Sequence, residues 1–374
     1  MPMKSIETIF SENLKRARRA RGLTQRELGA LLQYSEKSVS KWESGAAIPP
    51  STLLPTLADI LACRIDDLLY AGDEPAYFLG IDGGGTKTEF MLCDREGRRV
   101  AGVILGASNP IDIGIDACRR VLDAGIAEVT RGIVLRKIAV FAGIAGGISG
   151  DNREKIRAHL SGYGFGRCDN GSDAQNAVAM ALGDGDGITM IAGTGSIVFA
   201  KVGDTLTRFG GFGYLLEDGG SGFAIGRDAI LSALLAEEAG RAPTPLYRAI
   251  LEKTGEASVL AAIGKLYEGG KREFSTYAPL VFDACADKDP EAMAILDKNA
   301  AALAALIRRA DPVFGDRRRD IVMVGGLGNR ADRYLPLIAA HLPDDGRYHL
   351  RADTRKTVLG ALRLAGLSKE IESC

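Results

Sequence analysis

The chain has 374 residues, 46% of them hydrophobic, so it is long enough for two or three domains with buried cores. Its 47 basic and 48 acidic residues nearly cancel, so the overall charge does not indicate any class of partner. Six scattered cysteines without a C-x-x-C pair argue against a zinc site, an iron–sulfur site or a disulfide framework. They favour a reducing cytoplasm, and no apolar stretch approaches the ~20 residues that cross a bilayer. We therefore expect a cytoplasmic protein without a membrane partner.

The first seventy residues are predicted to form short helices. Residues 6–21 have a basic, amphipathic helical pattern. Thr24, with Glu27 three residues later, has the spacing of a capping box for a second helix that runs to Leu32. A third helix is predicted over 36–43. Two short helices joined by a tight turn are typical of a helix-turn-helix motif.

This region resembles the Cro/C1-type (XRE) helix-turn-helix family. The resemblance rests on Leu23-Thr24-Gln25-Arg26-Glu27-Leu28, on Ser35-Glu36-Lys37-Ser38-Val39-Ser40-Lys41-Trp42-Glu43-Ser44-Gly45, on Pro49 and on the stretch 53–69. It implies that the third helix enters the major groove of double-stranded DNA. Lys37, Ser38 and Lys41 would then contact bases or phosphates, and Gln25 a phosphate. Val39 and Trp42 would face the core.

The basic residues of this region have a second interpretation, because most charged runs are solvated helix faces. A domain of this kind also needs a homodimer to bind DNA well. We assign residues 1–70 to the helix-turn-helix domain. Residues 71–76 are short, polar and contain Pro and Gly, so they are predicted to be a linker.

A glycine-rich hairpin is predicted directly after the linker. The apolar run 77–81 ends at Asp82, and three glycines with Thr86-Lys87-Thr88 lead into a second apolar run at 90–92. Glycine backbone N–H groups, hydroxyls and Lys87 can donate to an anion, and Asp82 could hold Mg²⁺ through water. The alternative is an ordinary glycine-rich turn with an Asp cap.

The same pattern occurs a second time further along the chain. A strand is predicted at 188–192, then the small-residue turn Gly193-Thr194-Gly195-Ser196, then a strand at 197–202. This repetition suggests two duplicated lobes, 77–186 and 187–374, with a nucleotide between them. Other strands are expected at 100–103, 138–142 and 321–324, and helices at 116–130, 152–160, 174–182, 224–238 and from Lys356 onward. Residues 209–213 are expected to be a mobile glycine segment.

The ordered set of motifs from residue 77 to about 366 resembles the actin-like superfamily of sugar kinases and heat-shock ATPases. Within it, the chain looks most like the BadF/BadG/BcrA/BcrD ATPase family, which includes N-acetylglucosamine kinase. The resemblance implies an α/β, two-lobed actin-like fold and an ATP-dependent carbohydrate kinase that uses Mg²⁺. The residues that it assigns to ATP phosphates are Gly83, Gly84, Gly85, Thr86, Lys87 and Thr88 in the first loop and Gly193, Thr194, Gly195 and Ser196 in the second. It assigns Gly325, Gly326 and Gly328 to the adenosine site, Asp82 to Mg²⁺, Asp173 to the catalytic base, and Asn109, Asp173 and Asp218 to the sugar.

Three of these residues have simpler interpretations from the sequence alone. Asp173 could cap the helix at 174–182, Asn109 before a proline could be a turn residue, and Asp218 could be an ordinary loop acid. The family pattern Gly-Asp-Glu-Gly-Ser is replaced here by Glu-Asp-Gly-Gly-Ser with Gly219 at its centre, and Phe212 stands at a position often held by Trp. The identity of the sugar is therefore left open.

The two modules together predict a sugar-kinase-like transcriptional regulator that phosphorylates or senses an amino sugar such as N-acetylglucosamine. Two alternatives stand beside it. One is a sensor that binds ligand without turnover. The other is a kinase whose helix-turn-helix is only a docking or dimerisation module.

Overall fold

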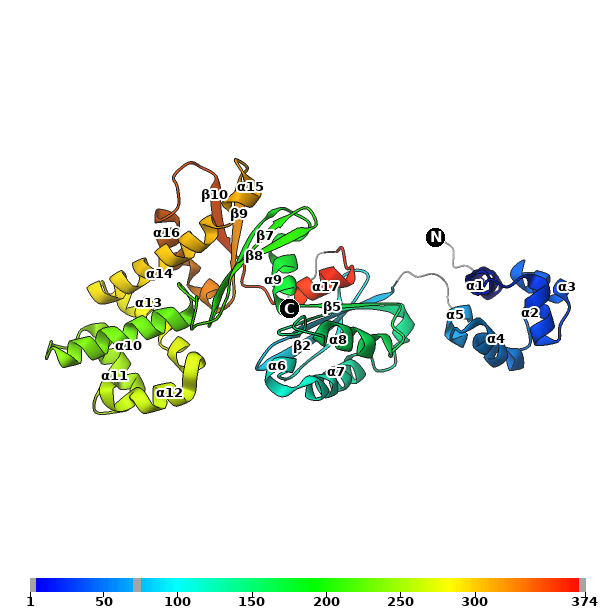
Figure 1. Cartoon of the computed structure of the whole chain (residues 1–374), viewed down its shortest axis with the longest axis horizontal. Helices are drawn as coiled ribbons and strands as arrows, with labels where there is room; N and C mark the ends of the chain where they lie inside the picture. Colours follow the sequence, from blue (N-terminus) through cyan, green and yellow to red (C-terminus); the bar gives the residue numbers. More distant parts are fainter. Residues whose placement is uncertain (1–4, 70–74, 370–374) are drawn as a thin grey trace. The chain divides into compact units, whose positions relative to one another are not determined.

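The computed structural model describes residues 5–69 and 75–369, so most of the predicted linker lies outside the described residues (Figure 1). The chain divides into two compact units, one containing α1–α5 together with residues 133–139 and 164–167, and the other containing nearly all of the two β-sheets and the helices that follow. In the described ranges, no helix is both long enough and apolar enough to span a membrane.

The N-terminal part of the first unit, residues 5–69, is a small all-α domain. Its helices are α1 (Ile6–Ala20), α2 (Gln25–Leu32), α3 (Glu36–Glu43), α4 (Leu54–Leu61) and α5 (Ile65–Leu69). The expected capping box is present, because Thr24 N donates to Glu27 Oε2 at 2.7 Å and Glu27 N donates to Thr24 Oγ1 at 3.2 Å. Val39 and Trp42 are buried in the core, as predicted.

The second unit begins with a five-stranded sheet. Its strands are β1 (Tyr77–Gly83), β2 (Lys87–Asp94), β3 (Arg99–Gly106), β4 (Ile138–Ile144) and β5 (Arg167–Gly171), in the order β3-β2-β1-β4-β5. The predicted hairpin is confirmed: β1 and β2 are antiparallel, and Asp82 lies opposite Glu89. Two carboxylates therefore lie on neighbouring strands at the start of the glycine loop.

A second five-stranded sheet has the same layout. Its strands are β6 (Gly187–Ala192), β7 (Ser196–Val202), β8 (Thr205–Gly210), β9 (Arg319–Val324) and β10 (Tyr348–Ala352), in the order β10-β9-β6-β7-β8. In both sheets a glycine turn joins the first two strands of an antiparallel meander, and later strands add beside its first strand, which is the predicted duplication. The strands β5, β8 and β10 were not expected. Residues 209–213 were expected to be mobile, but Phe209 and Gly210 are the last residues of β8 and pair with β7.

Helices cover both sheets, and the last of them returns to the first sheet. The helices are α6 (Pro110–Ile113), α7 (Ile115–Val129), α8 (Asn152–Ser161), α9 (Asp173–Leu182), α10 (Gly222–Glu238), α11 (Pro245–Thr254), α12 (Val259–Ser275), α13 (Ala278–Ala286), α14 (Pro290–Arg308), α15 (Asp311–Phe314), α16 (Ala331–Ala340) and α17 (Val358–Ala365). Helices α10–α14 pack together, with α14 against β7 (Figure 1). Helix α17 packs on β1 and α9. It approaches so closely that a Cβ at Gly80 would lie 2.8 Å from the carbonyl oxygen of Val358.

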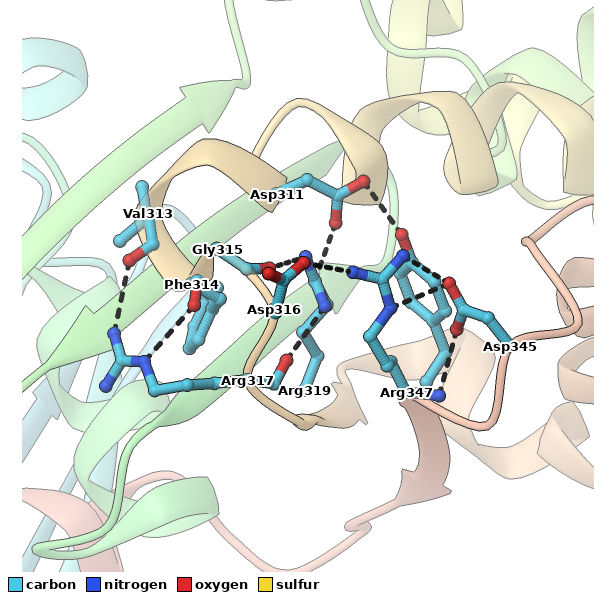
Figure 2. Close-up of polar contacts among 10 residues, drawn as sticks. Asp311, Val313, Phe314, Gly315, Asp316, Arg317, Arg319, Asp345 and Arg347 are labelled. Carbon is cyan, nitrogen blue, oxygen red and sulfur yellow. Dashed lines mark hydrogen bonds and ion pairs between the residues drawn. The ribbon is translucent and has the colours of Figure 1, made fainter.

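An arginine–aspartate cluster ties α15 to the last two strands (Figure 2). The side chain of Arg319 on β9 is 2% exposed, and its Nε lies 2.7 Å from Asp311 Oδ1. Its other nitrogens donate to the carbonyls of Arg317 at 2.8 Å and Gly315 at 2.6 Å. Tyr348 donates to the second oxygen of Asp311 at 2.7 Å. Burial and this hydrogen bond raise the pKa of Tyr348 to about 12, so the phenol remains a donor.

Candidate active site and nucleic-acid interface

The carboxylate of Asp82 is held at the end of β1 by two donors from distant segments. Asn176 Nδ2 on α9 donates to Oδ1 at 2.7 Å, and Thr357 Oγ1 at the start of α17 donates to Oδ2 at 2.6 Å. Burial raises the pKa of Asp82, these two donors lower it, and the neighbouring carboxylate of Glu89 raises it again. The raised pKa that results means that a cation beside Asp82 would stabilise its ionised form.

The surroundings of Asp82 fit Mg²⁺. Each of its carboxylate oxygens accepts one hydrogen bond from the protein and has a further lone pair. Among the described residues there is no cluster of three or more His, Cys, Asp or Glu side chains that would form an all-protein cage. Mg²⁺ is commonly held by one or two carboxylates, with water and substrate phosphates completing the shell. Asp82 offers this kind of ligand.

Asp173 lies at the first position of α9, one turn before Asn176. The helix is capped by Ser172, whose N–H donates to Gln175 Oε1 at 2.9 Å, so the alternative that Asp173 is the N-cap is wrong. Asp173 is solvent-exposed, and one of its oxygens accepts from Ala174 N at 3.0 Å. The surrounding protein displaces bulk water, and this desolvation, followed by the charge of Asp82, raises the pKa of Asp173.

The first glycine loop connects β1 to β2 beside Asp82. Its turn is closed by Gly84 N, which donates to the carbonyl of Lys87 at 2.9 Å. Gly85, Thr86 and Lys87 are exposed, so their N–H and side-chain groups can reach a ligand. Thr88 differs from the expectation of a phosphate-facing hydroxyl. It is fully buried and its Oγ1 donates to the carbonyl of Gly106 at 2.8 Å, because β2 turns it towards β3.

The second glycine loop is anchored by Asp218. Gly193 N donates to the carbonyl of Gly195 at 2.9 Å, which forms the tight turn between β6 and β7. Ser196 N then donates to Asp218 Oδ1 at 3.1 Å, and Ser196 Oγ donates to the carbonyl of Gly219 at 2.9 Å. Lys271 Nζ lies 2.6 Å from Asp218 Oδ2. Both oxygens of the predicted sugar ligand Asp218 therefore already have partners within the protein.

The glycines after β9 lie beside the second loop. Gly325 has a positive φ of 95°, and a Cβ there would lie 2.7 Å from the carbonyl oxygen of Ala192 at the end of β6. Gly328 N donates to the carbonyl of Gly325 at 2.9 Å, and Gly326 is exposed with open space beside its Cα. The second glycine loop and the glycines predicted to bind adenosine are thus adjacent, as a shared nucleotide site would require.

Asn109 is the N-cap of α6, and its side chain is hydrogen-bonded within the protein. Its Oδ1 accepts from Ile111 N at 3.0 Å, and its Nδ2 donates to Asp112 Oδ2 at 2.7 Å. Both contacts are local, as expected if Asn109 is a turn residue. A sugar would have to share this side chain with α6.

In the helical unit, Lys37 and Lys41 are exposed on α3, one turn apart and on one face. Ser38 is half-buried, and its hydroxyl lies 2.9 Å from that of Ser35. Gln25 Nε2 donates to Glu43 Oε2 at 2.8 Å, and Glu43 also pairs with the buried Arg18. The amide of Gln25 is therefore engaged between α2 and the end of α3.

The sequence did not predict three residues that contact the predicted site residues Asp82 and Asp218: Asn176, Thr357 and Lys271. Asn176 sits three residues after Asp173, at a spacing that puts both on one helix face, so that signal was available. Thr357 and Lys271 come from segments far away in the chain and carried no local motif.

Comparisons with known proteins agree with this arrangement. Residues 79–338 match the model of the BadF/BadG/BcrA/BcrD ATPase family, and residues 14–68 match a helix-turn-helix model. An N-acetyl-D-glucosamine kinase of Dictyostelium discoideum is 30% identical over 271 residues, which cover 67% of this chain and 84% of the relative. A candidate N-acetylglucosamine kinase of Chromobacterium violaceum has a solved structure that aligns with a TM-score of 0.61 and 29% identity, covering 78% of this chain and 99% of that one. The HTH-type transcriptional activator BcrR of Enterococcus faecalis is 37% identical over 65 residues, 17% of this chain and 31% of BcrR.

The fold and the two glycine loops define a two-lobed actin-like ATPase domain preceded by a helix-turn-helix domain. The chain belongs to the BadF/BadG/BcrA/BcrD ATPase family.

Proposed function

We propose that the chain transfers the γ-phosphate of ATP to a hydroxyl of an amino sugar, with N-acetylglucosamine as the leading substrate. The observation that carries the proposal is the pair of carboxylates Asp82 and Asp173 beside the first glycine loop, each with a raised pKa. The amino-sugar assignment is supported by the kinases of Dictyostelium discoideum and Chromobacterium violaceum to which the chain is similar.

The roles of the residues follow from phosphoryl-transfer chemistry. Mg²⁺, when bound, neutralises charge on the phosphates, and Asp82 with its donors Asn176 and Thr357 would hold it. Lys87 and the loop N–H groups would orient and stabilise the phosphate oxygens. Asp173 would accept the proton of the sugar hydroxyl as its oxygen forms a bond to the γ-phosphorus and the bond to ADP breaks.

The direct test is ADP release by the purified chain with Mg²⁺-ATP, across hexoses and their N-acetylated amino sugars. We expect one or a few amino sugars to stimulate ADP release, with a phosphorylated sugar as the second product. Absence of turnover with every sugar, while ATP and a sugar bind, would reject the kinase.

A catalytically silent sensor is the second candidate, favoured by a specific observation. The side chains of Asn109 and Asp218, both expected to contact sugar, are already bonded within the protein. A site of this kind could bind ligand without aligning a hydroxyl for transfer. Sugar and ATP binding measured by calorimetry, together with the turnover assay, separates the two candidates.

We further propose that the helical unit binds double-stranded DNA as part of a homodimer and that the sugar site regulates this binding in the cytoplasm. The similarity of residues 14–68 to a helix-turn-helix model, and the likeness of the region to BcrR, support this role. If sugar or ATP changes DNA affinity, DNA must change ligand affinity by the same factor.

Replacing both Lys37 and Lys41 by alanine should weaken DNA binding strongly. The two exposed ammonium groups on α3 are expected to neutralise phosphates or contact bases. Each lost phosphate contact lowers the slope of log affinity against log salt by about 1. Affinity for a random-sequence duplex, measured at several salt concentrations, should therefore show a slope reduced by about 2.

The control for this prediction removes two lysines from the other unit, Lys155→Ala with Lys265→Ala, and so changes the net charge equally. Both control lysines are in surface ion pairs. Equal behaviour of the two double variants would indicate that the helix-turn-helix is a docking or dimerisation module.

A further inference from the structure

Helix α12 is interrupted at Gly270, and Lys271, the next residue, points towards the second glycine loop. Gly270 has φ 57° and ψ −156°, a backbone conformation that glycine alone adopts readily. Lys271 follows directly, and its Nζ lies 2.6 Å from Asp218 Oδ2. Lys265, on the part of α12 before the break, pairs instead with Glu256 at the surface.

The ammonium of Lys271 also lies close to the glycine loop itself. A Cβ at Gly195 would lie 2.8 Å from Lys271 Nζ and 3.0 Å from Asp218 Oδ1. The absence of a side chain at Gly195 is therefore what makes room for the ion pair. Since Asp218 also accepts from Ser196 N, the lysine, the acid and the loop form one connected unit.

The two partners of this ion pair differ in exposure. The Asp218 side chain is 4% exposed, whereas that of Lys271 is 30% exposed. The buried carboxylate of Asp218 thus interacts with the loop through Ser196 N and with Lys271 through the ion pair. An ammonium has three N–H donors, of which Asp218 takes one, so Lys271 can bind a second anion without leaving Asp218.

We propose that Lys271 is a phosphate-binding residue for the nucleotide at the second glycine loop. This inference rests on the proposed ATP site. A lysine ammonium is a compact point charge suited to phosphate oxygens, and the loop N–H groups beside it are neutral donors. Asp218 acts as the positioning residue that fixes the ammonium over Gly195.

The test compares nucleotides with different numbers of phosphates on the full chain. Affinities for ATP, ADP, AMP and adenosine are measured by calorimetry with Mg²⁺ for the wild type, Lys271→Met and the control Lys265→Met. A charge-assisted hydrogen bond to phosphate corresponds to about a 10- to 100-fold change in affinity. We expect Lys271→Met to weaken ATP and ADP by this factor and to leave adenosine unchanged. Lys265→Met should bind every nucleotide as the wild type does.

Lys271→Met leaves Asp218 buried without its counter-ion, so a second variant, Lys271→Met with Asp218→Asn, removes both charges. The same selective loss of ATP and ADP in this double variant supports phosphate binding. Unchanged ATP affinity, or equal weakening of adenosine and ATP, would mean that Lys271 only neutralises Asp218 and would overturn the inference. A wild-type chain that binds no nucleotide would instead overturn the proposed function and the inference together.

Discussion

Asp173→Asn should lower kcat for sugar phosphorylation by about 100- to 10,000-fold, the range for removal of a general base. Asparagine has nearly the same shape but cannot accept the proton of the attacking hydroxyl. Because Asp173 is exposed and accepts a hydrogen bond from the N–H of the adjacent Ala174, which an asparagine oxygen can also accept, the change should leave the fold and nucleotide binding intact. The measurement is ADP release at saturating sugar and ATP, with ATP affinity measured in parallel.

The matched control is Asp169→Asn, which alters an aspartate on β5 that lies 3.8 Å from Arg157. This variant should retain wild-type turnover. If the kcat of Asp173→Asn lies within a few-fold of the wild-type value, Asp173 is not the general base.

The raised pKa of Asp173 also predicts a pH dependence. As the pH is lowered, a base with a raised pKa is protonated at a higher pH than an ordinary aspartate, whose pKa is about 3.9. The fall in kcat on acidification should therefore begin at a pH above that value. The stability of the folded state changes with pH in the opposite direction to kcat. The folded state binds this proton more tightly than the unfolded state, so stability decreases as pH rises from the ordinary carboxyl pKa through the raised one. Asp173→Asn should therefore be at least as stable as the wild type at neutral pH, and denaturant unfolding at two pH values would check this.

Arg319→Ala should cost about 3 kcal/mol of stability, the lower end of the range for breaking a buried ion pair, since Asp311 remains partly exposed. Arg319 also donates to the carbonyls of Arg317 and Gly315 (Figure 2). Its Cζ lies 5.1 Å from the centroid of the Tyr348 ring, a distance suited to a cation–π contact. Its loss would leave Asp311 Oδ1 without its ion pair and two carbonyls without their donor, while Tyr348 would still donate to Asp311 Oδ2. Denaturant unfolding of the full chain, followed by fluorescence and circular dichroism, measures the loss.

The adjacent Arg318 provides the control for this prediction. Its side chain is 62% exposed and pairs with Asp320 at the surface, so Arg318→Ala should change stability by no more than about 1 kcal/mol. Equal losses in the two variants would show that the cluster in Figure 2 contributes through general charge and not through the buried contacts.

Local signals in the sequence predicted most of the fold. The capping box at Thr24, the hairpin at Asp82 and the second glycine turn at Gly193 depend on residues close together in the chain, and all three are present. The strands β8 and β10 were missed. Each has a mixed burial pattern with exposed positions, so neither produces a run of apolar residues that identifies a buried strand.

The sequence by itself determined the two modules, the duplicated glycine hairpins and the chemical types around them, because each is encoded within a short stretch. Only the tertiary structure decided which groups hold Asp82, how Asp218 is used and where Lys271 points. Thr357 lies 275 residues from Asp82, and Lys271 reaches Asp218 through a helix break. Contacts of this kind depend on how α17 packs on β1 and how α12 bends, and no local pattern of residues specifies either.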